Sequence, residues 1–342
     1  MERARARQAI LTKPPGSLGR LEELGIQVAG ITASAIPAVA RRVVIVCAAD
    51  HGVVAEGVSA YPAAVTAQMV YNFVRGGAAI SVLARRARAR VRVADLGVDH
   101  NFPADLPIAH VKIGRGTANI ACGPAMPRAI AVQAMATGVR LARQAIRDRS
   151  RGCTVVGTGD MGIGNTTAAS AIVAAVTGAP VRDVTGRGTG IDDLTWERKV
   201  GVIERALAVN RPDPADPLGV LAKVGGYEIG AIAGVILGAA ARRQPVVIDG
   251  FISGAGALLA VTLCPAVRDY LIPAHASVEI GHRITLEHLG LIPLLSLQLR
   301  LGEGTGAALA MHIVDDAVAV LREMATFQEA GVAGRAGAPL SP

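Results

Sequence analysis

The sequence predicts an α/β protein in which a parallel β-sheet is buried between layers of helices. Short runs rich in valine and isoleucine alternate with longer alanine-rich stretches, as expected of consecutive strand–helix units. Hydrophobic residues make up 51% of the chain and charged residues only 18%, which excludes disorder over most of its length. The 40 glycines gather where a predicted strand passes into a predicted helix, which indicates loops that a ligand can approach closely.

The predicted strands are short and apolar, as is typical of strands buried on both faces of a sheet. They cover residues 43–48, 91–95, 154–156, 246–248 and 270–273. Alanine-rich or amphipathic segments between and around them predict helices. These cover residues 17–33, 63–86, 125–147, 165–177, 195–210, 227–241, 254–263, 277–289 and 306–327.

The two ends of the chain are predicted to form a smaller unit beside the sheet. A chain of 342 residues exceeds what one hydrophobic core usually absorbs. The helical segment 17–33 precedes the first strand, and the helix 306–327 follows the last one. We therefore expect an α/β core of residues 40–275 and a small helical lobe made of residues 1–39 and 276–342.

The net charge of +8 comes almost entirely from arginine. Basic residues occur in short scattered clusters with almost no interleaved aromatic residues. This pattern favours solvated faces or a small anionic ligand over nucleic acid.

The cysteines and the apolar runs bear on the compartment of the protein. The cysteines form no Cys-x-x-Cys pair and are predicted to be small core residues in a reducing compartment. They are Cys47, Cys122, Cys153 and Cys264. The N-terminus lacks the apolar core of a signal peptide, and the longest apolar run, about residues 229–241, is too short to span a bilayer. We expect a cytoplasmic protein without a membrane anchor.

The first glycine cluster, residues 157–164, lies between a predicted strand and the predicted helix 165–177. Glycines let a ligand approach the backbone, and the first amides of a helix form a site that favours phosphate. The cluster therefore predicts a phosphate-bearing substrate. The alternative interpretation is that these glycines only form tight turns.

The same glycines also match a dinucleotide-binding pattern. Gly157, Gly159 and Gly162 satisfy Gly-x-Gly-x-x-Gly, and Asp183 follows about twenty residues later. However, Asp183 comes after a Gly-Ala-Pro turn rather than at the end of an apolar strand. A lone match of this kind is weak evidence, so an NAD(P)-dependent oxidoreductase remains the alternative function.

Two further glycine clusters each carry one charged residue of interest. Residues 185–190 precede a helix with Lys199, which is placed to reach a phosphate or, alternatively, to lie on a solvated surface. Glu303 stands between Gly302 and Gly304 before the last helix. Partial burial by neighbouring structure would raise its pKa towards that of a useful base. The alternative is a glutamate that complements the helix dipole.

The segment Asp50-His51-Gly52 after the first strand allows a metal site or an acid–base pair. We predict no metal, because there is no His-Glu-x-x-His and the other histidines lack ligand spacing. The absence of a P-loop motif and of Gly-x-Ser-x-Gly argues against nucleotide hydrolysis and ordinary esterase chemistry.

With these loops in view, the chain closely resembles the nicotinate-nucleotide:dimethylbenzimidazole phosphoribosyltransferases of cobalamin nucleotide-loop assembly. The resemblance runs from Thr12 to about Ala330. It is carried by TKPPGSLGRLEELG (12–25), ADHGVVAEGVSAYPAAVTAQMVYNFVRGGAAISVLAR (49–85), GDMGIGNTTAAS (159–170), TGRGTGIDD (185–193), DGFISGAGAL (249–258), SVEIGHR (277–283) and LRLGEGTGAALA (299–310).

The resemblance implies a reaction and an architecture. The expected reaction transfers the 5-phosphoribosyl group of nicotinate mononucleotide to 5,6-dimethylbenzimidazole and gives α-ribazole 5′-phosphate and nicotinate. The family needs no metal and no organic cofactor, and it forms homodimers. Its fold is a Rossmann-like parallel sheet with a small lobe made from both ends of the chain.

The resemblance also assigns roles to residues. The catalytic base of the family falls on Glu303, and Asp160 stands where the family commonly has a glutamate that is longer by one methylene. Phosphate contacts fall on Gly162, Gly164, Asn165, Lys199 and the 186–190 loop with Gly186 and Gly188, while Asp249 and Ser277 lie near the nucleotide. The aromatic base would lie beside Ser59, Tyr61, Gln68 and Leu301. A non-catalytic nucleotide-binding protein is a further alternative, because Asp160 departs from the common pattern.

Overall fold

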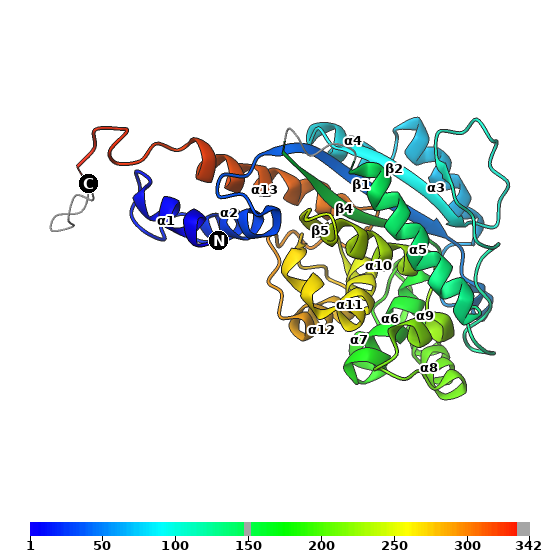
Figure 1. Cartoon of the computed structure of the whole chain (residues 1–342). Helices are drawn as coiled ribbons and strands as arrows, with labels where there is room; N and C mark the ends of the chain where they lie inside the picture. Colours follow the sequence, from blue (N-terminus) through cyan, green and yellow to red (C-terminus); the bar gives the residue numbers. More distant parts are fainter. Residues whose placement is uncertain (147–151, 334–342) are drawn as a thin grey trace.

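A computed structural model describes residues 1–146 and 152–333. In these residues, six parallel strands form one sheet in the order β3-β2-β1-β4-β5-β6 (Figure 1). This is the strand order of the doubly wound Rossmann fold, so the predicted fold class is confirmed. The strands are β1 (Val39–Ala49), β2 (Arg90–Gly97), β3 (Ala109–His110), β4 (Cys153–Met161), β5 (Val246–Ile248) and β6 (Leu271–Pro273).

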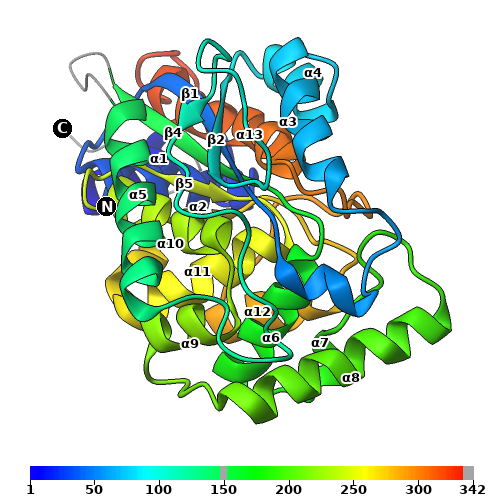
Figure 2. The same cartoon turned by 90° about the vertical axis from the view of Figure 1, so that its right-hand side faces the viewer.

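Helices cover both faces of the sheet (Figures 1 and 2). One face carries α3 (Ala64–Arg75), α4 (Ala79–Arg86) and α13 (Thr305–Glu323). The other carries α5 (Arg128–Ala145), α10 (Tyr227–Ala240) and α11 (Phe251–Leu263). Side chains of β1 alternate between the two layers, since successive residues of a strand point to opposite faces.

The remaining helices lie around this sandwich. They are α1 (Glu2–Ile10), α2 (Arg20–Thr32), α6 (Asn165–Thr177), α7 (Val181–Val184), α8 (Asp193–Asn210), α9 (Pro217–Val224) and α12 (Ile280–Leu289), with short 3₁₀ segments at Gly52–Glu56 and Pro265–Tyr270. Figure 2 shows α8 below α6, far from the strands.

All predicted strands are confirmed, and most helices match within a few residues. The prediction of one helix over 63–86 is wrong, because the chain breaks at Gly76, which takes a left-handed φ of 80° and ends α3. The sequence reasoning missed β3, which has only two residues, and the short helices α1, α7 and α9. The end of the predicted helix 125–147 lies outside the described residues.

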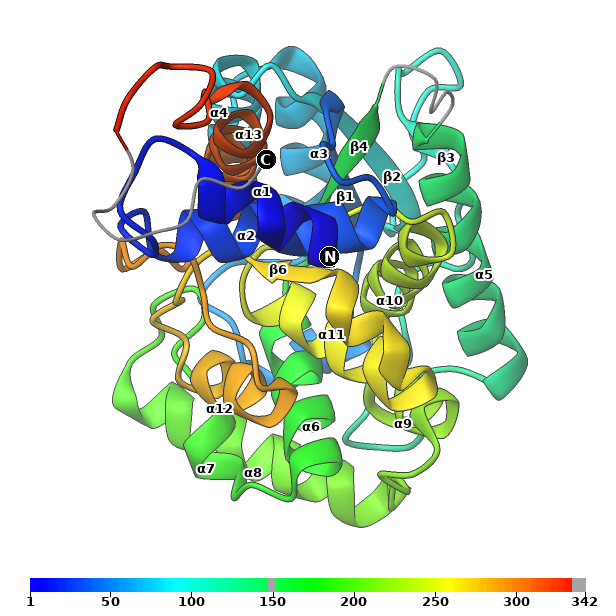
Figure 3. The same cartoon turned by 60° about the vertical axis from the view of Figure 1, so that its left-hand side comes forward.

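The N-terminal helices pack against α13 (Figure 3). Arg7 Nε donates to the Leu321 carbonyl at 2.6 Å, and the Thr12 amide donates to the Ala325 carbonyl at 3.0 Å. Leu24 and Val28 of α2 share one apolar cluster with α13 and with the sheet. The division into a core and a lobe stays a prediction, and residues 334–342 of the predicted lobe lie outside the described residues.

Two of the cysteines are buried and two are not. Cys47 and Cys153 lie in the sheet, as predicted. The prediction is wrong for Cys122 and Cys264, which are exposed because one lies in a turn and the other ends α11. Among the described residues, no helix combines the length and apolar character that crossing a membrane requires.

Candidate active site

The strand order reverses between β1 and β4, and ligands of doubly wound sheets bind at the carboxyl ends of the strands beside such a point. The loop before α13 lies at this edge, directly against β4. A Cβ atom on Gly159 would come within 2.4 Å of the Glu303 carbonyl oxygen. The first and third glycine clusters of the sequence are thus brought together.

The dinucleotide interpretation of the first cluster is not supported. Gly157 and Gly159 lie inside β4 rather than in a turn after it. A Cβ atom on Gly157 would come within 2.7 Å of Met311 Cε, so this glycine admits α13 to the face of the sheet. Asp183 belongs to the short helix α7 and does not end a strand.

Glu303 is buried, with 5% of its surface exposed. It takes a positive φ of 63°, between Gly302 at 80° and Gly304 at 92°. A left-handed backbone is uncommon for a glutamate and is often retained at functional sites. Its Oε2 accepts a hydrogen bond from the Ile80 amide at 3.3 Å. Burial raises the pKa of Glu303, and the Ile80 amide opposes this only in part.

Asp249, directly after β5, holds the Glu303 loop in place. Its Oδ2 accepts from the Gly304 amide at 3.1 Å and its Oδ1 accepts from the Ala307 amide at 2.9 Å. The side chain is fully buried. Burial raises the pKa of Asp249 to about 7, although the amides of α13 oppose the shift.

Asp160, near the end of β4, lies against the same loop. A Cβ atom on Gly302 would come within 3.0 Å of Asp160 Oδ2, and that oxygen accepts from Asn165 Nδ2 at 3.0 Å. Burial raises the pKa of Asp160 well above its usual range, and the negative charges of nearby carboxylates add to the effect. The site therefore gathers three buried carboxyl groups.

Lys199 is buried, so the surface interpretation is wrong. Its Nζ donates to Thr166 Oγ1 at 2.8 Å and to the Gly186 carbonyl at 3.3 Å. It forms no ion pair within residues 1–146 and 152–333. Burial lowers the pKa of Lys199 to about 8. The negative charge of Glu279 opposes this shift only in part. A buried cation without a close ion pair, beside Gly188 and α6, provides a site for an anion.

The loops predicted to hold the aromatic base lie along the exposed side of this site. The Ala60 amide donates to Thr189 Oγ1 at 3.1 Å, which places residues 59–61 beside the 186–190 loop. Arg300 Nη1 donates to the Gly188 carbonyl at 2.8 Å, so the loop before α13 also lies beside the 186–190 loop. Tyr61, Gln68 and Leu301 are exposed, and Ser59 is half-buried.

Comparisons with known proteins identify the family of the chain. A family model described as phosphoribosyltransferase matches residues 1–332. The chain belongs to this phosphoribosyltransferase family. It is 60% identical over 332 residues to the nicotinate-nucleotide–dimethylbenzimidazole phosphoribosyltransferase of Roseiflexus sp. (strain RS-1), covering 97% of this chain and 93% of that one. It is 58% identical to the protein of the same name from Geobacter sulfurreducens, covering 97% and 94%.

A solved structure of CobT from Thermus thermophilus superposes with a TM-score of 0.92 at 50% identity. The match covers 97% of this chain and 98% of that one. The described fold is therefore that of a phosphoribosyltransferase over nearly its whole length.

Two buried acidic residues of the phosphoribosyltransferase were not predicted. Glu228 Oε1 lies 2.6 Å from His51 Nε2, and both side chains are buried. The His51 ring lies next to Gly162 and, like Glu228, next to Gly226. A glutamate at the start of the apolar segment 227–241 is the signal that could have pointed to a buried partner. The second is Glu279, in the predicted SVEIGHR motif, which lies against Gly186.

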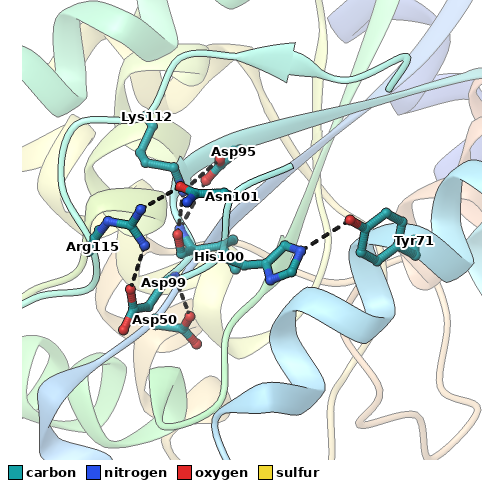
Figure 4. Close-up of polar contacts among 9 residues, drawn as sticks. Asp50, Tyr71, Asp95, Asp99, His100, Asn101, Lys112 and Arg115 are labelled. Carbon is teal, nitrogen blue, oxygen red and sulfur yellow. Dashed lines mark hydrogen bonds and ion pairs between the residues drawn. The ribbon is translucent and has the colours of Figure 1, made fainter. Parts of the chain in front are cut away.

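A second polar cluster lies at the carboxyl end of β2 (Figure 4). Its carboxylates are paired: Asp95 with Lys112 at 2.8 Å and Asp99 with Arg115 at 3.1 Å. Asp50, from the segment predicted as a metal site or acid–base pair, joins this cluster by accepting the Asp99 amide at 2.7 Å. Most of the polar groups here have partners, so this cluster is a structural network.

Proposed function

We propose that this phosphoribosyltransferase transfers the 5-phosphoribosyl group of nicotinate mononucleotide to 5,6-dimethylbenzimidazole, giving α-ribazole 5′-phosphate and nicotinate for cobalamin nucleotide-loop assembly. The observation that carries the proposal is the buried Glu303, whose loop reaches the glycine beside Lys199 through the hydrogen bond from Arg300 to the Gly188 carbonyl. The names of the relatives support both substrates.

The chemistry of this transfer matches a site with one carboxylate base. The leaving nicotinate is a pyridinium in the substrate and departs with a neutral ring nitrogen, so no acid has to protonate it. A benzimidazole nitrogen attacks the anomeric carbon from the opposite face, and the configuration inverts from β to α. The attacking nitrogen is the one without a proton, and the N–H on the other ring nitrogen loses its proton to the Glu303 carboxylate.

The phosphate of the nucleotide would be held by Lys199 and by backbone amides. Gly162 and Gly164 lead into α6, whose first residue is Asn165. First-turn amides and a lysine are suited to phosphate. Gly186 and Gly188 lie next to the Lys199 ammonium. Fixing the phosphate places the anomeric carbon, and positioning supplies much of the rate.

The remaining predicted residues are assigned to places around Glu303 and the phosphate site at Lys199. Asp160, buried and close to Gly302, would support the cationic character that develops on the ribosyl group. Asp249 acts on the loop of Glu303, while Ser277 lies beside Glu279 on the nucleotide side. The aromatic base would lie against the exposed surface made by Ser59, Tyr61, Gln68 and Leu301.

We infer a homodimer located in the cytoplasm, with no metal or organic cofactor. Large apolar side chains are exposed along the segment before the catalytic loop, which favours contact with a second copy. These are Val278, Ile280, Ile292 and Leu297. Size-exclusion chromatography with light scattering tests the dimer.

The experiment that tests the reaction is a chromatographic assay of purified protein with both substrates and a chelator. Formation of α-ribazole 5′-phosphate with stoichiometric nicotinate is expected, and the Glu303→Gln variant should form almost none. A folded protein that binds the nucleotide but forms no product would count against dimethylbenzimidazole as acceptor. Saturable NAD(P) binding with an absorbance change at the nicotinamide would instead support an oxidoreductase.

A further inference from the structure

Glu279 is a buried carboxylate without a role in the proposed proton transfer. It stands at the N-cap of α12 and is 6% exposed. Its Oε2 has no hydrogen-bond partner in the described part of the chain. An unpaired buried oxygen of this kind calls for a donor, and residues 1–146 and 152–333 supply none.

Glu279 and Lys199 approach the same glycine from two different helices. A Cβ atom on Gly186 would come within 1.9 Å of Glu279 Oε2, while Lys199 Nζ donates to the Gly186 carbonyl at 3.3 Å. A closed ion pair between them would satisfy both groups. No such pair is formed among the described residues, and Lys199 donates to Thr166 instead.

Lys199 and Glu279 carry opposite charges but do not pair. Together they suit a ligand that has an anionic group for Lys199 at one end and hydrogen-bond donors for Glu279 at the other. A nucleotide has both, because its phosphate is an anion and its ribose hydroxyls donate hydrogen bonds. An ionised carboxylate is only an acceptor, so Glu279 suits hydroxyls and would repel a second phosphate. The Ser277 hydroxyl accepts the Glu279 amide at 3.3 Å and so helps to hold this residue in place.

We propose that Glu279 accepts hydrogen bonds from the ribose hydroxyls of the nucleotide and makes the site specific for ribonucleotides over deoxyribonucleotides. This inference rests on the proposed function, since it takes the phosphate to lie at Lys199. A deoxynucleotide would leave the buried carboxylate unpaired. A site built to bond a hydroxyl rejects the analogue that lacks it far more strongly than a purely apolar site would.

The test compares nicotinate mononucleotide with its 2′-deoxy and 3′-deoxy forms. In the wild type, kcat/KM for the ribonucleotide should exceed that for at least one deoxy form by about 10²- to 10⁴-fold. Glu279→Gln, which keeps the shape but removes the charge, and Glu279→Ala should lose most of this ratio, mainly by slowing the ribonucleotide. Glu287→Gln is the matched control, because Glu287 is exposed on the same helix and pairs with Arg283 at 2.8 Å.

Calorimetric titration with the same three nucleotides separates this proposal from the proposed reaction. A preference for ribose in Kd, lost in Glu279→Gln, supports the role of Glu279 even if the protein does not turn over dimethylbenzimidazole. Equal affinities and equal kcat/KM for all three nucleotides in the wild type would overturn it. So would a Glu279→Gln variant that is weakened to the same extent towards each of them.

Discussion

Two neighbouring groups of acidic side chains lie at the carboxyl edge of the sheet, and they differ in how their charge is balanced. At the end of β2, the carboxylates form ion pairs with Lys112 and Arg115 (Figure 4). At the ends of β4 and β5, no carboxylate pairs with a lysine or arginine in the described residues. The second group comprises Asp160, Asp249 and Glu303.

The difference separates a structural network from a reactive site. Burial without a counter-ion raises the pKa of all three carboxyl groups of the second group, and to about 7 for Asp249. A carboxyl group with a raised pKa is a better proton acceptor at neutral pH. Asp50 is intermediate in its pairing. One of its carboxylate oxygens accepts a hydrogen bond from the Asp99 amide, and the other has no hydrogen-bond partner among the described residues.

The largest expected effect comes from removing the base in the unpaired group. Glu303→Gln should lower kcat by about 10²- to 10⁴-fold while both substrates still bind. The base acts only when deprotonated, and burial raises its pKa. Wild-type kcat should therefore increase with pH until the pH exceeds the raised pKa of Glu303. Initial rates of nicotinate release over a pH series measure this. Normal turnover of the variant would show that another group takes the proton.

An intermediate effect is expected from breaking the paired group. Lys112→Met leaves Asp95, which is 2% exposed, without its cation. The free energy of unfolding should fall by about 2 kcal/mol, because a buried carboxylate that loses one hydrogen-bonding partner costs about 1 to 3 kcal/mol. Activity of the folded fraction should change little. Urea unfolding measures the change.

Arg115→Gln is the matched control, because both members of the Arg115–Asp99 pair are more than half exposed, at 53% and 62%. It should cost less than about 1 kcal/mol. If Lys112→Met and Arg115→Gln lower the free energy of unfolding equally, burial does not make the Lys112–Asp95 pair more important for stability than the Arg115–Asp99 pair.

The smallest expected effect is on the pH dependence of stability. A carboxyl group whose pKa is raised by folding binds more protons in the folded state, so its contribution to stability falls as pH rises between its unfolded and folded pKa. For Asp249 this window runs from about 4 to about 7. Glu303→Gln removes one of the three charges and should be more stable than the wild type near pH 8.

That stability difference should shrink towards pH 4, and each unit of raised pKa corresponds to about 1.4 kcal/mol. Urea midpoints of both proteins at several pH values measure it. A difference independent of pH would mean that folding does not change the pKa of Glu303.

Much of the fold could be predicted from local patterns. The strands at β1 and β5 and the helix α6 were predicted from apolar runs and from glycines at their ends. The break at Gly76 was not, because two short helices share one continuous amphipathic pattern. The match of Gly157 to the dinucleotide-binding pattern misleads for a similar reason. A glycine that lets a helix pack closely looks, in the sequence, like a glycine that lets a ligand bind, and only the structure shows that α13 packs there.

The sequence by itself determined the alternation of strands and helices, the glycine loops and, through its motifs, the resemblance to a family. Tertiary structure alone decided that Lys199 and Glu279 are buried without closing an ion pair, and that Glu303 is removed from water. Burial and charge balance depend on residues far apart in the chain, because packing brings α13 onto β4 and α12 onto the loop before α8. Local sequence patterns do not predict which charged side chains are left without an ion-pair partner when these elements pack together.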